Sequence, residues 1–361
     1  MMRIKEVTRG ELVEKYIVEN VIANLKPGDK IPSERELASE LGVAVHTVNK
    51  CLATLTERGV LRRRKGRGTF LAECSPRGKR VRILTRSMDY YERNAVTNWF
   101  NFQYVLEGFS IRAQTFGIVP EIFIQDLSLP PTKKTLEPLL DPDVSGYLFH
   151  VHRELGITRQ WAECLRENGK IVLCRSFAPF ENFNTVYGDM RSGVRDAVCS
   201  LLKSGRRRIA LLEMEFQDDG YITSRIEGFR DAHAEFNLTP DPALIRECSD
   251  LNEESGYVAT QDLLKEHIPF DAIFAGMDIR AYGAMRALKE AGLQIPEDVA
   301  VIGSDNLPQD LETVPSLSSV NYPMHEIGEA LCDLFVEVVR NPSSDPLCRK
   351  LKCEFIQRKS S

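Results

Sequence analysis

Hydrogen-bonding side chains and cations are concentrated between residues 46 and 68, and their types match the chemistry of double-stranded DNA. Four polar side chains stand close together at His46, Thr47, Asn49 and Lys50. A run of cations follows at Arg62, Arg63, Arg64, Lys65 and Arg67. Polar side chains hydrogen-bond to base edges in the major groove, and cations neutralise phosphates. The two sets predict a nucleic-acid surface, provided that the fold presents them together.

Two short helices are predicted here, of which the second contains the four polar side chains and the first packs beside it. Ser33 is followed three residues later by Glu36, which is the spacing of a capping box at a helix start. Gly42 ends that helix, because glycine is favoured just beyond a helix C-terminus. A second helix is predicted over residues 44–58. Its apolar stripe, expected to face the core, consists of Val45, Val48, Leu52 and Leu55. The polar set lies on the opposite face, as in a recognition helix.

The cations are predicted to lie on a hairpin with a glycine turn. Residues 60–61 and 69–71 are short β-rich runs, and between them Gly66 and Gly68 flank Arg67. Glycine lets the backbone approach a sugar-phosphate wall closely. A solvated charge run and a phosphate-cradling nucleotide loop are the alternatives. The second is weakened because no GxGxxG or GxxxxGK(S/T) pattern follows a strand here.

The segments PSERELASELGV, HTV, LTERGVL and GRGTF resemble the winged helix-turn-helix of GntR-type bacterial transcription regulators, over most of residues 5–73. The resemblance implies DNA contacts from Arg35, His46, Thr47, Lys50, Gly66, Arg67 and Gly68. The residues themselves add Asn49 on the recognition helix and Arg64 on the hairpin. The chain departs from the family pattern where Val45 and Asn49 replace two usual arginines. Because arginine to guanine is the commonest specific contact, we expect an operator unlike the family's typical one.

From Val81 onward, short apolar runs alternate with helical periods. The runs are VRILT, EIFIQD, GYLFHV, KIVLCR, RIALLEM, ALIREC, AIFAG and VAVIGSD. Helices are predicted between them over residues 103–115, 155–168, 191–204, 224–236, 254–267 and 280–292. Strands that are apolar on both faces and alternate with helices are typical of a doubly wound α/β fold.

Ligands of such folds bind beyond the carboxyl ends of the strands. The polar residues that follow the predicted strands are therefore candidates for a ligand site: Arg86, Ser87, Asp126, Arg175, Asp278 and Asp305. Carboxylates accept hydrogen bonds from pairs of hydroxyls, and an arginine donates in a planar fork. This set suits a sugar or a similar polyol.

The segments RIEGFRDAH, DAIFAGMD, YGAMRALKEAGLQIPEDVAVIGSDN and EFIQRKS resemble the effector domain of LacI/GalR-type regulators, itself similar to periplasmic sugar-binding proteins, over nearly all of residues 81–361. With the GntR-type head, the whole resembles arabinose-responsive repressor chimeras. The resemblance implies sugar control, dimerisation and two lobes joined by three crossovers. By pattern, the first lobe spans roughly residues 81–179 plus a piece after 305. The effector contacts that it implies are Arg225, Asp278, Asp305 and the aromatic residues Trp99 and Phe102.

Three of the implied effector contacts have a structural alternative. Asp278 could instead cap the helix that begins at residue 279, and Arg225 could form a surface ion pair. Trp99 could be plain core. Leu251 and Met277 depart from the family pattern, so the identity of the ligand stays open.

Length and charge divide the chain into a basic head and an acidic body. The 361 residues suffice for two or three domains. Residues 1–80 carry 17 Lys and Arg against 10 Asp and Glu, whereas the remainder carries 30 against 42. Nucleic acid is therefore expected to meet the head only. We predict domains at residues 1–73 and 81–361, joined by the linker 74–80. A helix over residues 3–25 should cover the core of the head.

The predicted fold class is α/β, with an N-terminal winged helix-turn-helix and a two-lobed, doubly wound, periplasmic-binding-protein-like domain. Neither a signal-peptide core nor a membrane-length apolar run is found, which predicts a cytoplasmic protein. The nine cysteines lack CxxC spacing and are expected to be reduced core thiols. No cofactor or metal is expected.

An enzyme is the weaker interpretation. His150 and His152 alternate at a strand end, but no HExxH pattern or third ligand accompanies them. The pair Asp218-Asp219 before Gly220 is more typical of a turn than of an acid/base pair. The sequence thus predicts a homodimeric, sugar-responsive repressor that binds double-stranded operator DNA. An activator, or a regulator that responds to a non-sugar metabolite such as a purine, is the alternative. A binding module without DNA activity is a third class.

Overall fold

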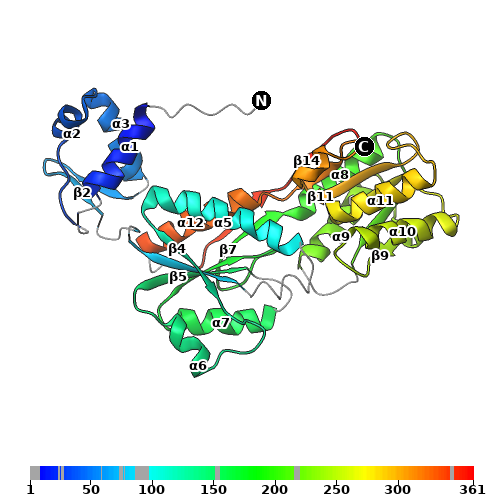
Figure 1. Ribbon diagram of the computed structural model, residues 1–361, viewed down its shortest axis with the longest axis horizontal. Coiled ribbons are helices and arrows are strands. Elements are labelled where there is room, and N and C mark those ends of the chain that lie inside the picture. The colour runs from blue at the N-terminus through cyan, green and yellow to red at the C-terminus, as the bar shows by residue number, and fades with distance from the viewer. Residues whose placement is uncertain are drawn as a thin grey trace.

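The computed structural model describes residues 9–22, 25, 28–57, 59–72, 76, 78–85, 97–150, 155–214, 220–341 and 345–361, except for the side chains of residues 11, 57, 97–101, 155 and 221. Residues 9–72 form the head, and residues 78–361 form the body, which consists of two lobes (Figure 1).

The head packs helices against an antiparallel hairpin. The helices are α1 (Arg9–Tyr16), which continues into the π-helical turn η1 (Ile17–Val21), α2 (Glu34–Leu41) and α3 (Val45–Glu57). The hairpin pairs β1 (Leu61–Arg64) with β2 (Gly68–Leu71). Val13, Ile17 and Ile22 are buried with the apolar residues of α2 and α3, which confirms a helix covering the head's core.

The local signals of the head fold as predicted, with one exception. Ser33 Oγ accepts from the Glu36 backbone N–H at 3.3 Å, while Glu36 Oε2 accepts from the Ser33 N–H at 2.6 Å. Gly42 then ends α2 with a φ of +60°. In α3, Val48, Leu52 and Leu55 are buried, but Val45 is 43% exposed. Its prediction as a core residue was wrong, because Val45 is the first residue of α3 and its side chain is open to solvent there.

Lobe 1 is a parallel sheet with the strand order β13-β7-β6-β5-β3-β4. Its strands are β3 (Arg80–Thr85), β4 (Val119–Ile124), β5 (Val144–His150), β6 (Ile171–Arg175), β7 (Asn184–Asp189) and β13 (Cys348–Lys352). Its helices are α5 (Thr97–Phe116), α6 (Lys133–Leu136), η3 (Glu137–Leu139), α7 (Leu155–Glu167) and α12 (Met324–Arg340). A Cβ on Gly108 of α5 would meet His325 O of α12 at 2.0 Å, so glycine permits this close helix contact.

Lobe 2 has the order β14-β12-β11-β10-β8-β9, parallel except for the pair β12–β14. Its strands are β8 (Ile209–Glu213), β9 (Ile245–Glu247), β10 (Ala272–Ala275), β11 (Ala300–Asp305), β12 (Ser318–Asn321) and β14 (Glu354–Ile356). Its helices are α8 (Met190–Lys203), α9 (Gly220–Glu235), η4 (Pro242–Leu244), α10 (Glu253–Lys265), α11 (Asp278–Glu290) and η5 (Pro308–Leu311). In Figure 1 the two lobes lie side by side and are joined by extended segments.

The described chain passes between the lobes in three places: after β7, after β12 and after β13. Each passage leaves the carboxyl end of a parallel strand, so the carboxyl ends of both sheets meet at the crossovers. The prediction that lobe 1 ends at residue 179 was wrong, because β7 pairs with β6 and extends lobe 1 to Asp189. The predicted linker also ends too late, since Arg80 already pairs within β3.

Candidate DNA-binding and effector sites

The head presents the predicted base-contacting residues on one exposed helix face. His46 and Lys50 on α3 are exposed, and Thr47 is half-buried in the first turn of α3. Arg35, in the first turn of α2, is also exposed. Donors in these positions are available for base edges or phosphates.

Asn49 is held by an acidic residue that the sequence analysis missed. Its Nδ2 lies 2.9 Å from both carboxylate oxygens of Glu34 at the start of α2. Arg63 of the hairpin donates to the same carboxylate at 3.1 Å and to the Asn49 backbone oxygen at 3.4 Å. This network ties α2, α3 and β1 together. Asn49 Nδ2 can therefore donate to a base only if its bonds to Glu34 are exchanged for bonds to DNA.

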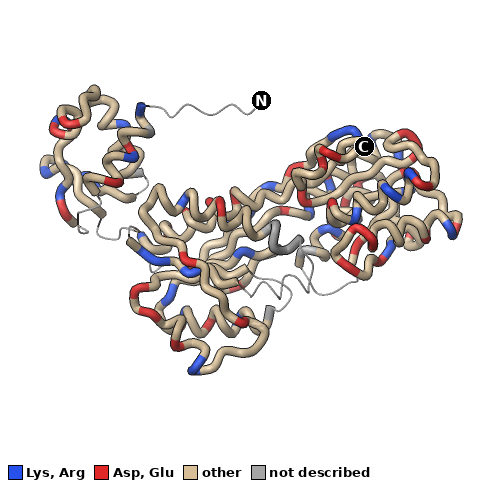
Figure 2. The backbone as a smooth tube through the Cα atoms, in the orientation of Figure 1, with Lys and Arg blue, Asp and Glu red and all other residues tan. Residues whose placement is uncertain are grey.

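The hairpin tip carries the predicted cations around a glycine turn. Arg64 pairs with Gly68 across the hairpin, and its guanidinium lies 5.1 Å from the centre of the Phe70 ring. Gly66 and Gly68 have φ values of +71° and +110°, a conformation that favours glycine. Arg67 between them is exposed. In Figure 2 both signs of charge lie on the head, as they do on the body.

On the lobe 1 side of the crossovers, Arg175 is fully buried at the end of β6. Its Nη1 lies 3.3 Å from His150 Nε2, and its guanidinium stacks 3.8 Å from the centre of the Phe177 ring. Phe102 of α5 meets His150 edge-on at 4.9 Å. Tyr322, which follows β12 in the crossover, donates to Ser176 O at 3.1 Å. Burial raises the pKa of Tyr322 to about 12, so its hydroxyl keeps its proton.

On the lobe 2 side, Arg225 of α9 forms a buried ion pair. Its Nε and Nη2 donate to Glu213 at 2.6 and 3.0 Å, and Arg280 of α11 donates to the same carboxylate at 3.0 Å. Burial acts to raise the pKa of Glu213, but the charges and hydrogen bonds of Arg225 and Arg280 outweigh it and lower that pKa. The surface-ion-pair alternative for Arg225 was wrong, because this pair is buried and fixes the plane of the guanidinium.

Asp278 and Asp305 lie at the carboxyl ends of β10 and β11. Asp278 is fully buried, and its oxygens accept from Ser319 Oγ at 2.6 Å and from the Leu307 N–H at 2.9 Å. The helix-cap alternative was wrong, since these partners lie outside α11. The prediction of a direct ligand contact by Asp278 also loses its geometric support. We assign Asp278 the positioning of the loop that follows Asp305, whose φ of +127° turns the chain sharply there.

A second buried carboxyl group, Asp310, supports the same loop. It accepts from Tyr282 Oη at 2.7 Å and from Arg358 at 3.3 Å. Burial and neighbouring carboxylates raise the pKa of Asp278, and burial raises that of Asp310 to about 6. One proton shared within this pair is the physical consequence.

The remaining sequence candidates lie elsewhere or outside the described residues. Asp126 is exposed after the edge strand β4 and closes a turn by accepting from the Ser128 N–H. Arg86 and Ser87 lie outside the described residues, as does the side chain of Trp99. His150, Glu213 and Arg280 were missed as parts of this site. Glu213 ends an apolar run at a strand's carboxyl end, and the rule that selected Arg175 would have found it.

The described residues contain no group of three or more His, Cys, Asp or Glu side chains that could hold a metal ion. Among the described helices, none combines the length and apolar character that crossing a membrane requires. The eight described cysteines are free thiols, most of them buried.

Known families match both parts of the chain. Residues 10–71 match the family described as bacterial regulatory proteins, gntR family, and residues 198–361 match the periplasmic binding protein-like domain. The chain joins a gntR-type head to a periplasmic-binding-protein-like body. This confirms the predicted fold class, including the combination of the two parts.

Individual curated relatives match about half of the chain. The HTH-type transcriptional regulator CelR of Thermobifida fusca is 31% identical over 182 residues, covering 50% of this chain and 53% of that protein. The HTH-type transcriptional repressor PurR of Edwardsiella ictaluri is 28% identical over 217 residues, covering 54% and 63%. The chain thus spans between half and two thirds of the length of these curated relatives. A LacI family transcriptional regulator from Enterococcus faecium, solved with bound ribose, has the same fold over 78% of this chain and 98% of its own, with a TM-score of 0.63 and 23% identity.

Proposed function

We propose that this protein is a ligand-responsive, sequence-specific transcription regulator, a repressor of carbohydrate-utilisation genes that a sugar or related small molecule releases from operator DNA. One observation carries the proposal: a single chain joins a cationic winged head to a two-lobed body whose facing strand ends hold buried arginines and carboxylates. The relatives support it, because CelR and PurR are named as a transcriptional regulator and a repressor, and the Enterococcus faecium structure holds a sugar.

We assign DNA contact to the head, residues 1–73, and effector binding and dimerisation to residues 81–361 in a cytoplasmic protein. The DNA-contacting residues are Arg35, His46, Thr47, Asn49, Lys50, Arg64, Gly66, Arg67 and Gly68. The effector-contacting residues are Trp99, Phe102, Arg175, Arg225 and Asp305, with Asp278 in support. Arginine forks and a carboxylate complement the alternating hydroxyls of a sugar.

Control of the head would come from closure of the lobes on the effector. Arg175 and Tyr322 lie on one side of the crossovers, and Arg225 and Asp305 on the other. A ligand that bonds to both sides favours the closed arrangement, which is a hinge-type population shift. In a dimer, closure changes the separation of the two heads and therefore their fit to two half-sites.

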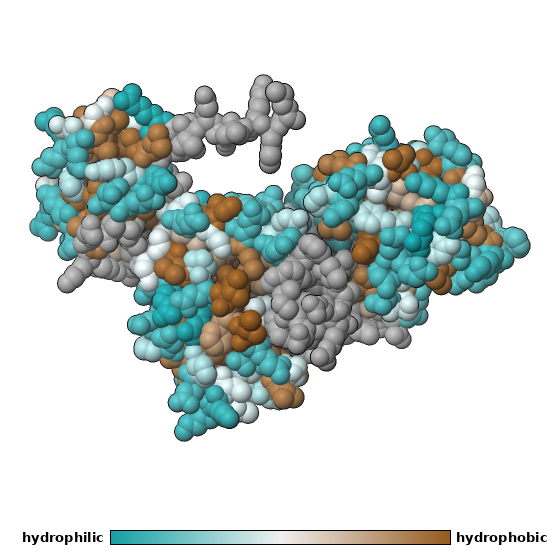
Figure 3. Space-filling model, viewed as in Figure 1, coloured by the Kyte–Doolittle hydropathy of each residue, from teal (hydrophilic) through white to brown (hydrophobic). Residues whose placement is uncertain are grey.

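An exposed apolar face on lobe 1 supports the homodimer. Ile122 and Ile124 on the edge strand β4 are 61% and 64% exposed, and Ile111 on α5 is exposed as well. Figure 3 shows apolar side chains gathered on this side of lobe 1. An unpaired apolar edge strand invites association, and a second copy of the chain would cover it symmetrically.

The assignment of the head is tested by substituting two exposed donors. Lys50→Ala with Arg67→Ala removes one cation from α3 and one from the hairpin tip, so we expect loss of binding to duplex DNA in a mobility-shift assay. The matched control, Lys203→Ala with Lys265→Ala, removes two exposed cations from lobe 2 and should bind as the parent does. Unchanged binding by the first variant would contradict the assignment.

The alternative that the sequence leaves open is a regulator that responds to a non-sugar metabolite such as a purine. Thermal-shift screening separates the two, because a ligand that binds the folded state raises the melting temperature by mass action. An increase in the melting temperature with a sugar supports the proposal. An increase with a purine and not with any sugar supports the alternative.

A further inference from the structure

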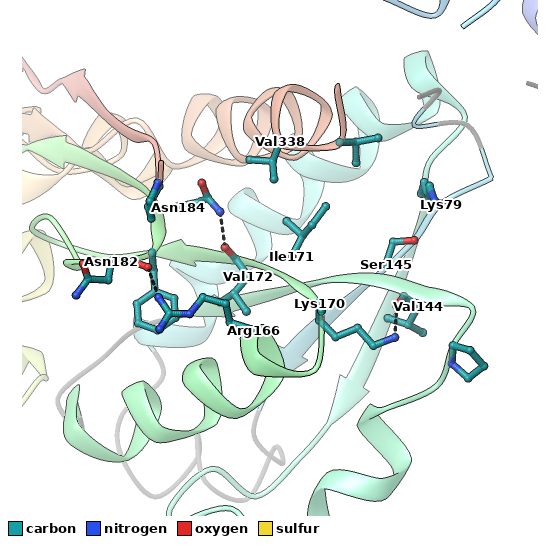
Figure 4. A pocket seen from close by; sticks show the side chains of 15 residues that line it. Lys79, Val144, Ser145, Arg166, Lys170, Ile171, Val172, Asn182, Asn184 and Val338 are labelled. Carbon is teal, nitrogen blue, oxygen red and sulfur yellow. Dashed lines mark hydrogen bonds between the residues drawn. The ribbon is translucent and has the colours of Figure 1, made fainter. Parts of the chain in front are cut away.

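A pocket of about 670 Å³ opens on lobe 1 at the end opposite to the crossovers. Its walls come from the first residues of β5, β6 and β7, together with the ends of α7 and α12 (Figure 4). Because these strands are parallel, their first residues lie at the amino edge of the sheet, a strand length from the proposed effector site. The pocket is therefore separate from the effector site.

The charge of this pocket has one sign. Lys79, Arg166 and Lys170 line it, and its lining residues, all within the described part of the chain, include neither Asp nor Glu. Two carboxylates outside the lining, Asp143 and Asp141, attract the Lys170 ammonium group, and Asp141 is already paired with two arginines. Its Oδ2 accepts from Arg82 at 2.9 Å and from Arg80 at 3.3 Å. A positive pocket on an acidic body selects anions.

Two of these cations are held in place by the protein. Arg166 donates from Nη1 to Asn182 O at 2.9 Å, and its guanidinium lies 4.9 Å from the centre of the Phe183 ring. Lys170 Nζ donates to Asp141 O and Val144 O at 2.6 and 2.7 Å, as Figure 4 shows for Val144. Side chains fixed before a ligand arrives lose little entropy when it binds.

The rest of the lining is largely apolar. Ile171 lies on the sheet side, and Val338 and Val339 lie on the last turns of α12 (Figure 4). The volume falls within the range of about 300–1,000 Å³ that is common for sites of small organic molecules. Charge and shape together call for a molecule with an anionic group on a compact, partly apolar body.

We propose that this pocket is a second ligand site, which binds a small organic anion, either a phosphate ester or a carboxylate. The site goes beyond the proposed function and does not depend on sugar control. Its position gives it a route to the head. Lys79 directly precedes β3, where the chain enters lobe 1, and Arg340 follows Val339 at the end of α12. Arg340 packs on the head, because a Cβ on Gly59 would lie 2.2 Å from its Nε.

The test is isothermal titration calorimetry on the full chain with phenyl phosphate, benzoate and uncharged benzyl alcohol. We expect at least one anion to bind with one site per chain, and benzyl alcohol not to bind. Arg166→Gln should weaken anion binding at least tenfold, because it removes the fixed charge. The matched control is Arg159→Gln on the same helix, since Arg159 also donates to a backbone oxygen and stacks on a phenylalanine but does not line the pocket. It should bind as the parent does.

Several results would overturn the proposal. One is that neither anion binds at millimolar concentration, and another is that Arg166→Gln and Arg159→Gln weaken binding equally. A third is that the anion protects residues 275–280 and 303–306 from hydrogen exchange but does not protect residues 142–145 and 169–172. Should Arg166→Gln fail to fold, Lys79→Gln serves as the second variant, because the side chain of Lys79 is exposed. The anion that binds more tightly, phosphate or carboxylate, identifies the class of ligand.

Discussion

At the scale of single residues, the body depends on charged groups placed where water cannot screen them. Glu213 accepts from both Arg225 and Arg280, and all three side chains are buried. Such a triad need not stabilise the fold relative to apolar residues, but losing its one anion leaves two uncompensated cations. Its natural role is to hold Arg225 in one orientation at the crossovers.

Glu213→Gln should therefore destabilise the protein by about 3–5 kcal/mol, the cost typical of breaking a buried ion pair. The matched control is Glu227→Gln, whose carboxylate pairs with Arg191 at 2.9 Å on the surface and should change stability by less than about 1 kcal/mol. Denaturant unfolding measures both. Equal, small changes in the free energy of unfolding would show that the Glu213 carboxylate does not stabilise the folded protein in this way.

The buried pair of Asp278 and Asp310 predicts how stability changes with pH. The pKa of Asp310 is raised from 3.8 to about 6, and that of Asp278 is raised as well. In this window the folded state retains a proton that the unfolded state has released, so the pair's contribution to stability falls as pH rises. Asp278→Asn removes one acid and should flatten this fall between pH 3.8 and about 6.

Melting temperatures across that pH range measure this effect. Asp231→Asn is the control, because the hydrogen bond from Arg191 lowers the pKa of Asp231, and this group contributes stability that is lost as pH falls. An Asp278→Asn variant with the pH slope of the parent protein would contradict the assignment of a shared proton.

At the scale of elements, the sequence predicted the strands that consist of a continuous apolar run. All eight apolar runs correspond to observed strands. Six of them lie inside their sheets, where packing on both faces needs continuous apolar residues, and two, β4 and β9, are edge strands. β7, β12, β13 and β14 were not predicted. β12 has the polar sequence SSVN. Its buried Ser318 and Ser319 form hydrogen bonds with Ser360 and Asp278, so no hydrophobic pattern reveals this strand. β13 is an edge strand in which exposed and half-buried residues alternate.

The residues of the candidate effector site were also predicted only in part. A strand-end rule found Arg175 and Asp305, and family resemblance added Arg225. The partners that hold them, Glu213 and Arg280, come together only through tertiary packing. Asp278 was chosen for the right place in the chain, but its side chain turns into the protein, where it bonds to Ser319 and the Leu307 backbone.

The edge strand β4 predicts the oligomeric state. Ile122→Asp with Ile124→Asp places two charges on the exposed apolar face, so a dimer that uses this face should dissociate to monomers. Analytical ultracentrifugation measures the change. Leu12→Asp, on an equally exposed residue of α1, is the control and should leave the dimer intact. A stable dimer in the double variant would place the interface elsewhere.

At the scale of the whole molecule, we assign DNA contact to a basic head and ligand contact to an acidic body. In this assignment, cations at the hairpin attract phosphates, and the few donors on α3 discriminate bases. Because Val45 and Asn49 stand where arginines are usual in the resembling family, the phosphate contacts should carry a large share of the affinity. In the proposed dimer, the crossovers would connect the effector residues to the arrangement of the two heads.

The most direct test of this account is fluorescence anisotropy of the full chain on a duplex that it has selected from a random library, measured across a panel of sugars. The account predicts that at least one sugar lowers the affinity about 5–150-fold, which corresponds to a coupling free energy of about 1–3 kcal/mol. The same affinity in the presence of every sugar in the panel would contradict it.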